Sequence, residues 1–251
     1  MIESRIRAVC FDVGGTLAKP HPSVGDVMAR VLQRHDLDVP ADLLNESMVA
    51  FGEYYARVYD DDESLWSEDD RQRQMWMDGY SLVLNRSGVT ENIEQLVSDI
   101  YYEFDKPECW RLFDGVQETF AWLHEQGYRI ALISNWGVGL SQIMDGLGLG
   151  EYIDTVVASA EVGSHKPKPS MFYMALERLG VAPEEAIHVG DHMTADIRAA
   201  QAVDITPVLV VHGGIPPWDP TAGVPENDVH TITSIPQVRE LLEAGAFDIA
   251  G

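Results

Sequence analysis

Lysine is scarce in this chain, and basic residues as a whole are few. Among 251 residues there are 17 lysines and arginines against 41 aspartates and glutamates, a formal net charge of −24. A surface of that charge repels nucleic acid and anionic membranes, so neither is expected as a partner. It also repels anionic substrates at long range, so a phosphate-binding site needs local positive charge. The candidates among the lysines are Lys19, Lys106, Lys166 and Lys168.

Cysteines are few, and long apolar runs are absent. The two cysteines, Cys10 and Cys109, do not make a disulfide framework, and Cys10 lies in an apolar run that predicts a core position. No run of about 18 apolar residues predicts a membrane span. Residues 1–7 lack the apolar region of a secretory signal, so we expect cytoplasmic residence. Nothing in the sequence predicts a particular oligomeric state.

The part of the chain after Pro107 alternates between two kinds of apolar pattern. Helical spacing predicts helices at 116–124, 141–147, 170–179, 194–202 and 236–244. Short apolar runs predict strands at 6–11, 128–134, 153–159, 186–190, 206–211 and 229–232. This alternation is typical of an α/β fold with a Rossmann-like, doubly wound parallel sheet. A stretch with several prolines and glycines, 213–228, is expected to be a loop.

The segment from about 23 to 105 has helical spacing without strand-length apolar runs. It predicts four helices, near 24–32, 43–55, 76–84 and 93–104, and therefore an inserted helical bundle. We expect a core domain formed by 1–16 and 107–251, with the insertion at 17–106. The acidic run at 60–63 is most simply a solvated loop, because it lacks the alternating ligand spacing of a calcium loop.

Polar side chains follow the predicted strands. Asp12 follows the first strand, Ser134 and Asn135 the second, and Asp191 a later one, with Asp196 five residues further on. In a doubly wound sheet, ligands bind at the carboxyl ends of the strands.

Taken singly, these residues have simpler interpretations. Asp12 and Ser134 alone are typical turn or helix-capping residues, and Lys166 alone is typical of the surface. Together, two strand-end carboxylates, a lysine and a hydroxyl predict a site for a divalent cation and a phosphate.

Four segments in order carry a family resemblance. They are "DVGGTL" from Asp12, "LISN" ending at Asn135, "HKPKPSMF" around Lys166, and "GDHMTAD" from Gly190 to Asp196. The chain resembles the haloacid dehalogenase superfamily of hydrolases, in the branch with a helical cap between the first and second motifs. The resemblance covers almost the whole chain and implies that residues 17–106 form the cap.

The resemblance also implies roles in catalysis. Asp12 would be a nucleophile that forms an aspartyl-phosphate intermediate, and Ser134, with Asn135, would hold the phosphoryl group. Lys166 would neutralise charge between the nucleophile and the phosphate. These roles imply hydrolysis of a small phosphorylated substrate.

Magnesium is the cofactor that the resemblance implies. Asp12 and Asp191 would bind Mg²⁺ through their carboxylates, and Gly14 through its backbone carbonyl. Asp196 would be a further acid of the metal site, either as a direct ligand or in the outer shell.

Gly14 departs from the family pattern. Phosphatases of the family usually have there a second aspartate, which protonates the leaving group and then helps to activate water. A positioned general acid–base typically contributes about 100- to 10,000-fold, so its loss should be felt most with poor alkoxide leaving groups. One interpretation is a magnesium-dependent phosphatase that is weak on ordinary esters, with His21 as an unfavoured replacement acid.

Two other interpretations stay open. Haloacid dehalogenases also lack the second aspartate, but they generally lack the Gly190-Asp191 pair as well. Phosphonoacetaldehyde hydrolases need a cap lysine, and no lysine occurs between residues 20 and 105. The other interpretation is a non-enzymatic protein that binds phosphate or has a regulatory role.

In this family the cap closes over the site and selects the substrate, with expected hinges near 17–22 and 105–114. Most of the aromatic residues of the cap are expected in its core, and a minority would line an apolar substrate pocket. Trp136 is expected beside the phosphate loop. His188 is expected in the core, whereas His192 is close enough to the proposed site for a role there.

Overall fold

A six-stranded parallel sheet forms the centre of the molecule. The computed structural model describes residues 6–61, 68–213 and 229–247. The strands are β1 (Ala8–Phe11), β4 (Arg129–Ser134), β5 (Thr155–Ala158), β6 (Ala186–Gly190), β7 (Thr206–Val210) and β8 (His230–Ile232). They pair in the order β5-β4-β1-β6-β7-β8, and each pair is parallel. The predicted fold class is confirmed.

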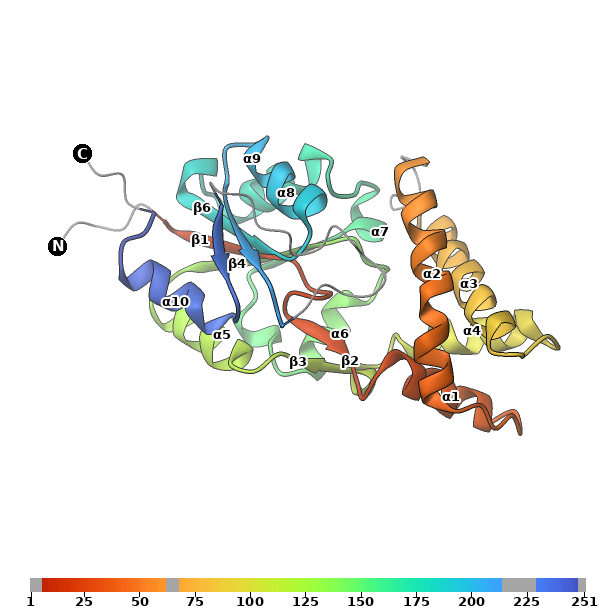
Figure 1. Cartoon of the computed structure of the whole chain (residues 1–251). Coiled ribbons are helices and arrows are strands. Elements are labelled where there is room, and N and C mark those ends of the chain that lie inside the picture. Colours follow the sequence, from red (N-terminus) through yellow and green to blue (C-terminus); the bar gives the residue numbers. More distant parts are fainter. Residues whose placement is uncertain (1–5, 62–67, 214–228, 248–251) are drawn as a thin grey trace.

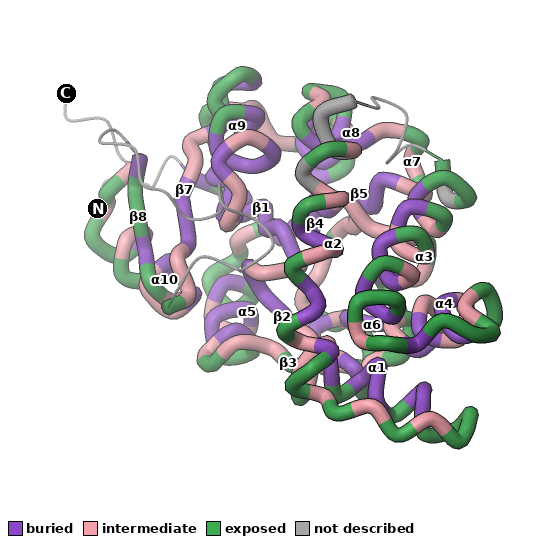
Figure 2. The backbone as a smooth tube through the Cα atoms, turned by 45° about the vertical axis from the view of Figure 1, so that its right-hand side comes forward, coloured by how far each residue is buried: buried purple, intermediate pink, exposed green. Residues whose placement is uncertain are grey.

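Alternate residues of β1 point to opposite layers of helices. Val9 and Phe11 pack with α5 (Val116–Glu125), α6 (Leu140–Gly146) and α10 (Pro236–Glu243). Ala8 and Cys10 pack with α8 (Pro169–Leu179) and α9 (Ala199–Gln201) on the other face (Figure 1). Because both faces are covered, β1 is buried along its whole length (Figure 2).

The strand order places a crevice beside β1. The chain passes from β1 to β4 on one side, and after β5 it crosses to β6 on the other side of β1. Successive connections therefore run in opposite directions at this point, and they leave room at the carboxyl ends of the strands. The residues that follow β1, β4 and β6 meet there.

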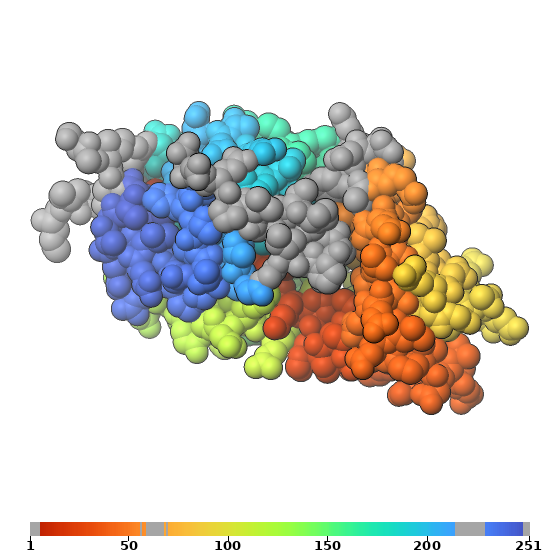
Figure 3. Space-filling model, viewed as in Figure 1, coloured from red at the N-terminus to blue at the C-terminus, as the bar shows by residue number. Residues whose placement is uncertain are grey.

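The inserted segment is a bundle of four helices with its own hydrophobic core. They are α1 (Val24–Gln33), α2 (Ala41–Asp61), α3 (Asp69–Arg86) and α4 (Ile93–Glu103), and they lie beside the carboxyl edge of the sheet (Figures 1 and 3). Gly79 allows α3 to approach α2, because a Cβ there would lie 2.3 Å from the Phe51 ring. None of the helices in the described part of the chain is long and apolar enough to cross a membrane.

A small second sheet joins the bundle to the core. β2 (Ala18–Pro20) pairs antiparallel with β3 (Trp110–Leu112), within the segments expected to be hinges. Runs of three residues are too short for a periodic signal, so these strands were not predicted. The other short elements are η1 (Pro107–Cys109), η2 (Gly150–Tyr152), α7 (Ser159–Val162), η3 (Pro183–Glu185) and the π-helix η4 (Met193–Arg198).

Several sequence predictions differ from the observed bounds. The helix expected at 194–202 is η4 followed by α9, and α2 and α3 are longer than expected because their polar faces carry no apolar signal. α2 includes Asp60 and Asp61 of the acidic run, whereas 62–63 lie outside the described residues. The predicted loop at 213–228 lies outside them except for Gly213.

A buried carboxylate at the end of α4 ties the bundle together. Glu103 accepts hydrogen bonds from Arg34 (2.8 and 3.2 Å) and Lys106 (2.8 Å), and its carboxylate lies 3.4 Å from Arg30. The hydrogen bond from Arg34 is the main reason why the pKa of Glu103 falls from its usual 4.5 to about 2. Because the folded-state pKa is lowered, this carboxylate stabilises the fold above pH 4.5 and loses that effect as the pH falls towards 2.

We expect Glu103→Gln to lower the free energy of unfolding by about 1–3 kcal/mol at pH 7, since hydrogen bonds to a charged group are lost. Thermal unfolding of both proteins between pH 7 and pH 3 measures this effect. The difference between variant and wild type should shrink as the pH falls below 4.5. Glu94→Gln, at an exposed position on the same helix, is the control. A pH-independent difference would contradict the charge network.

Candidate active site

Asp12, directly after β1, is held by two side chains from other loops. Lys166 Nζ donates to Asp12 Oδ1 at 2.6 Å, and Ser134 Oγ at the end of β4 donates to the same oxygen at 3.0 Å. The other carboxylate oxygen, Oδ2, has no hydrogen-bond partner among the residues that the structure describes. The carboxylate is thus oriented through one oxygen, and the second stays available for a ligand.

Lys166 bridges two carboxylates. Its Nζ also donates to Asp196 Oδ1 at 2.6 Å, and the Lys166 side chain is only 3% exposed. Burial disfavours the charged ammonium, but Asp12 and Asp196 outweigh burial and raise the pKa of Lys166 above its usual value. The lysine is therefore charged throughout the physiological pH range.

Asp196, in η4, has both oxygens occupied by the protein. Oδ1 accepts from Lys166 and pairs with His188 Nε2 at 3.0 Å, and Oδ2 accepts from the backbone N–H of His192 at 3.1 Å. Burial opposes its charge, yet Lys166 and His188 lower the pKa of Asp196 below its usual range. With both oxygens bonded, Asp196 acts on the site mainly by holding Lys166.

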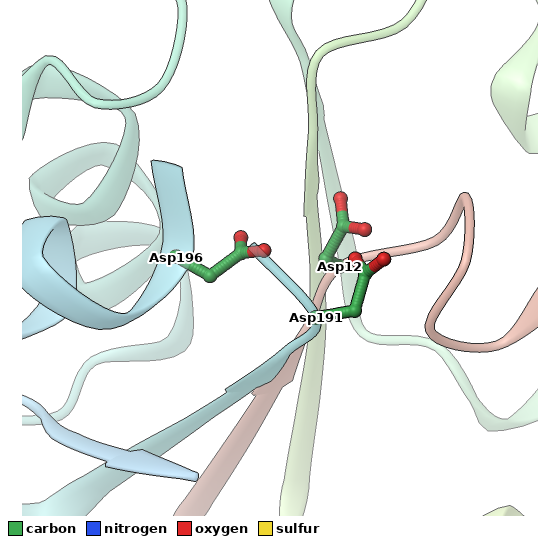
Figure 4. Close-up of side chains that lie close together, drawn as sticks. All are labelled: Asp12, Asp191 and Asp196. Carbon is green, nitrogen blue, oxygen red and sulfur yellow. The ribbon is translucent and has the colours of Figure 1, made fainter. Parts of the chain in front are cut away.

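Asp191, directly after β6, completes a cluster of three acids. One oxygen from each of Asp12, Asp191 and Asp196 lies within 4.8 Å of the others, and Figure 4 shows the carboxylates of Asp12 and Asp191 side by side. Thr16 Oγ1 donates to Asp191 Oδ1 at 3.2 Å. Burial, followed by the charges of Asp12 and Asp196, raises the pKa of Asp191 well above its usual value.

The charge of this cluster fits a divalent cation. When all three carboxylates are ionised, the one ammonium of Lys166 leaves two negative charges without compensation among these groups. Magnesium prefers carboxylate oxygens and keeps several waters, so Asp12 and Asp191 are the residues that would hold it. Asp196, already saturated, fits an outer-shell position better than a direct one.

Two glycines allow close approaches at this site. Gly15 has a φ of +80°, and a Cβ there would lie 2.4 Å from Asp191 Oδ2, so only glycine fits the turn. A Cβ on Gly14 would lie 3.3 Å from Cζ3 of Trp136. A larger residue at position 14 would therefore displace the indole ring by a few tenths of an ångström.

A cavity of about 260 Å³ extends from the acidic cluster into the bundle. The predicted site residues Asp12, Gly14, Ser134, Asn135, Lys166, Asp191 and Asp196 all line it. His21 is not among the described lining residues, and its backbone N–H donates to Cys109 O instead. The structure thus gives no support to His21 as a replacement acid.

Comparison with known proteins agrees with these features. The family model described as haloacid dehalogenase-like hydrolase matches residues 6–204. The chain belongs to this family. The predicted recognition is therefore confirmed.

Relatives of this hydrolase include proteins of several kinds. Mouse haloacid dehalogenase-like hydrolase domain-containing protein 3 is 31% identical over 96% of this chain and 97% of its own length. Glyceraldehyde 3-phosphate phosphatase of Methanopyrus kandleri is 28% identical, covering 95% and 96% of the two chains. The crystal structure of the HAD-hydrolase YfnB from Bacillus subtilis, bound to magnesium, has a TM-score of 0.76 at 17% identity, covering 95% and 99%.

Two lining residues of the hydrolase also hold neighbouring parts of the site in place. The side chain of Asn135 donates to the Lys166 carbonyl (3.0 Å) and accepts from the Lys166 N–H (2.8 Å), so it positions the lysine. Nδ1 of His192 accepts from the N–H groups of Thr194 and Ala195, which caps η4.

The sequence interpretation missed two contacts. Thr16 lies inside the first motif, "DVGGTL", and its place there could have indicated a role at the site, but no role was assigned to it. His188 is buried as expected, and its bond to Asp196 could not be foreseen from a strand pattern.

We expect Mg²⁺ to raise the melting temperature of the wild type. At a Mg²⁺ concentration of 100 times its dissociation constant, the free energy of unfolding should increase by about 2.7 kcal/mol. Asp191→Asn removes one uncompensated charge. The metal-free variant should therefore be more stable than the metal-free wild type at pH 7, and it should respond little to Mg²⁺. Thermal unfolding with and without Mg²⁺ measures both effects.

Asp114→Asn, at an exposed position, is the matched control and should respond to Mg²⁺ like the wild type. An equal response of Asp191→Asn and the wild type would show that the cation binds elsewhere.

Proposed function

We propose that this hydrolase is a magnesium-dependent phosphatase that cleaves a small phosphate monoester through a phosphoaspartate at Asp12. The observation that supports it most is the difference between the two oxygens of Asp12, which lines the cavity. Oδ1 is held by Lys166 and Ser134, and Oδ2 has no hydrogen-bond partner among the described residues. The phosphatase relative from Methanopyrus kandleri supports the same reaction class.

In the first step, Asp12 Oδ2 forms a bond to phosphorus, the ester P–O bond breaks, and the leaving group departs with the electron pair. Lys166 offsets the negative charge of both the nucleophile and the phosphoryl group. Ser134 Oγ lies close enough to donate to a phosphoryl oxygen. Asp12 and Asp191 would hold Mg²⁺, which would supply further positive charge to stabilise the phosphoryl group.

In the second step, water forms a bond to phosphorus and the bond to Asp12 Oδ2 breaks. The proton of the water leaves on the released phosphate, and the free carboxylate is regenerated. Position 14 offers no acid for the first step and no base for the second, so the reaction depends on the quality of the leaving group.

A panel of phosphate monoesters with graded leaving groups tests the proposal. We expect kcat/KM to fall steeply from nitrophenyl to alkyl phosphates, and to fall to background without Mg²⁺ or in Asp12→Asn. A phosphorylated Asp12 should be detectable by mass spectrometry after acid quenching.

Equal rates for the wild type, Asp12→Asn and metal-free protein would refute the phosphatase. Binding of beryllofluoride without turnover would then indicate a phosphate-binding protein. Halide release from haloacids without Mg²⁺ would indicate a dehalogenase.

Gly14→Asp tests whether a missing acid explains the leaving-group dependence. We expect a gain of up to about 100-fold on alkyl phosphates and little change on nitrophenyl phosphate. Trp136→Phe with Gly14→Asp provides room for the new side chain, since the indole is the nearest neighbour of the added Cβ. A uniform change across the panel would point to a role for Gly14 other than a missing acid.

A further inference from the structure

A continuous row of aromatic rings leads from the catalytic crevice into the bundle. Ring centroids are 4.7 Å apart for Trp136 and Trp110, 6.0 Å for Trp110 and Phe104, and 5.8 Å for Phe104 and Tyr80. Tyr80 and Trp76 follow at 5.8 Å. All five line the cavity, so one wall of it is aromatic from Gly14 to α3.

The cap end of this cavity carries an unpaired polar atom. Gln72, in α3, is 1% exposed and lines the cavity, and its Oε1 has no hydrogen-bond partner in the described part of the chain. A buried acceptor without a donor destabilises a fold, and native proteins contain few of them. Oε1 itself is almost fully shielded, so a ligand with an N–H or O–H group would satisfy it once the amide turns toward the cavity.

The charge of the lining limits what fits at that end. Lys166 is the only lysine or arginine among the described lining residues, and it lies at the acidic cluster. A second anionic group on the substrate would therefore find no cation near the aromatic wall.

We propose that the substrate is an aryl phosphate: a phosphate monoester of a flat aromatic alcohol whose ring carries a hydrogen-bond donor for Gln72. This inference rests on the proposed phosphatase function and names its substrate class. It also accounts for Gly14, because an aryloxide leaves with the electron pair of the P–O bond and is protonated afterwards by solvent. The aromatic ring of the substrate lies in the part of the cavity that this row of rings lines.

Phosphonates test binding without turnover, since their P–C bond is not hydrolysed. The probes are 4-hydroxybenzyl-, 4-methylbenzyl- and cyclohexylmethylphosphonate, measured by calorimetry with Mg²⁺ present. We expect 4-methylbenzylphosphonate to bind about tenfold tighter than the cyclohexyl compound, because rings stack on the aromatic wall. The 4-hydroxy compound should bind about fivefold tighter again, by donating to Gln72.

Two variants assign these preferences to residues. Gln72→Leu should abolish the advantage of the hydroxyl compound, leave 4-methylbenzyl binding unchanged and raise the melting temperature of the free protein. Trp76→Leu should weaken both benzyl compounds and leave the cyclohexyl compound unchanged. The matched controls are Gln74→Leu, exposed on α3, and Trp122→Leu, on α5 away from the cavity.

The outcomes separate this inference from the proposed function. Equal binding of the benzyl and cyclohexyl compounds, or a hydroxyl preference that survives Gln72→Leu, overturns the aryl phosphate. If either of these results is found and the protein still releases phosphate from alkyl and sugar esters, the phosphatase function is supported and only the aryl substrate is refuted. The expected binding pattern without hydrolysis of any ester supports the aryl site and refutes the phosphatase.

Discussion

The buried bridge from Lys166 to Asp12 and Asp196 is the interaction on which the rest of the site depends. Three carboxylates, each with one oxygen within 4.8 Å of the others, repel one another strongly, and a nearby cation relieves that repulsion. Lys166 supplies one positive charge, and both of its acid partners orient it. Asn135 clamps the backbone of the lysine, so the loop after β5 is fastened to the end of β4. The bridge thus joins three strand ends into one site.

The two parts of the molecule contribute different chemistry to one cavity. The core supplies charged and polar groups at the carboxyl ends of β1, β4 and β6, and the bundle supplies an apolar, aromatic wall. Trp110 in β3 and Trp136 in the loop after β4 connect them, with ring centroids 4.7 Å apart. Trp136 also lies against Gly14. The residue that departs from the family pattern therefore lies where the charged and the aromatic halves of the cavity meet.

Features with a strong local pattern were predictable. The six strands of the core were found from short apolar runs, and Asp12, Ser134 and Asp191 from their positions after strands. The strands β2 and β3 were missed because three residues carry no period, and the π-helix at 193–198 because its pattern does not differ from that of an α-helix. The contacts of Thr16 with Asp191 and of His188 with Asp196 were missed for another reason: their partners are distant in sequence or on a neighbouring turn.

The order of the motifs along the chain was enough to identify the family. The parallel sheet and the residues at its carboxyl edge could be predicted because hydrophobic periodicity and polar residues at strand ends are local properties of the sequence. Only the tertiary structure decided which oxygen of Asp12 is held and that Asp196 accepts hydrogen bonds from Lys166, His188 and the backbone of His192. It also decided that aromatic rings from separate elements line one cavity together with Gln72. Those facts depend on distances between segments far apart in the chain, and no local pattern specifies them.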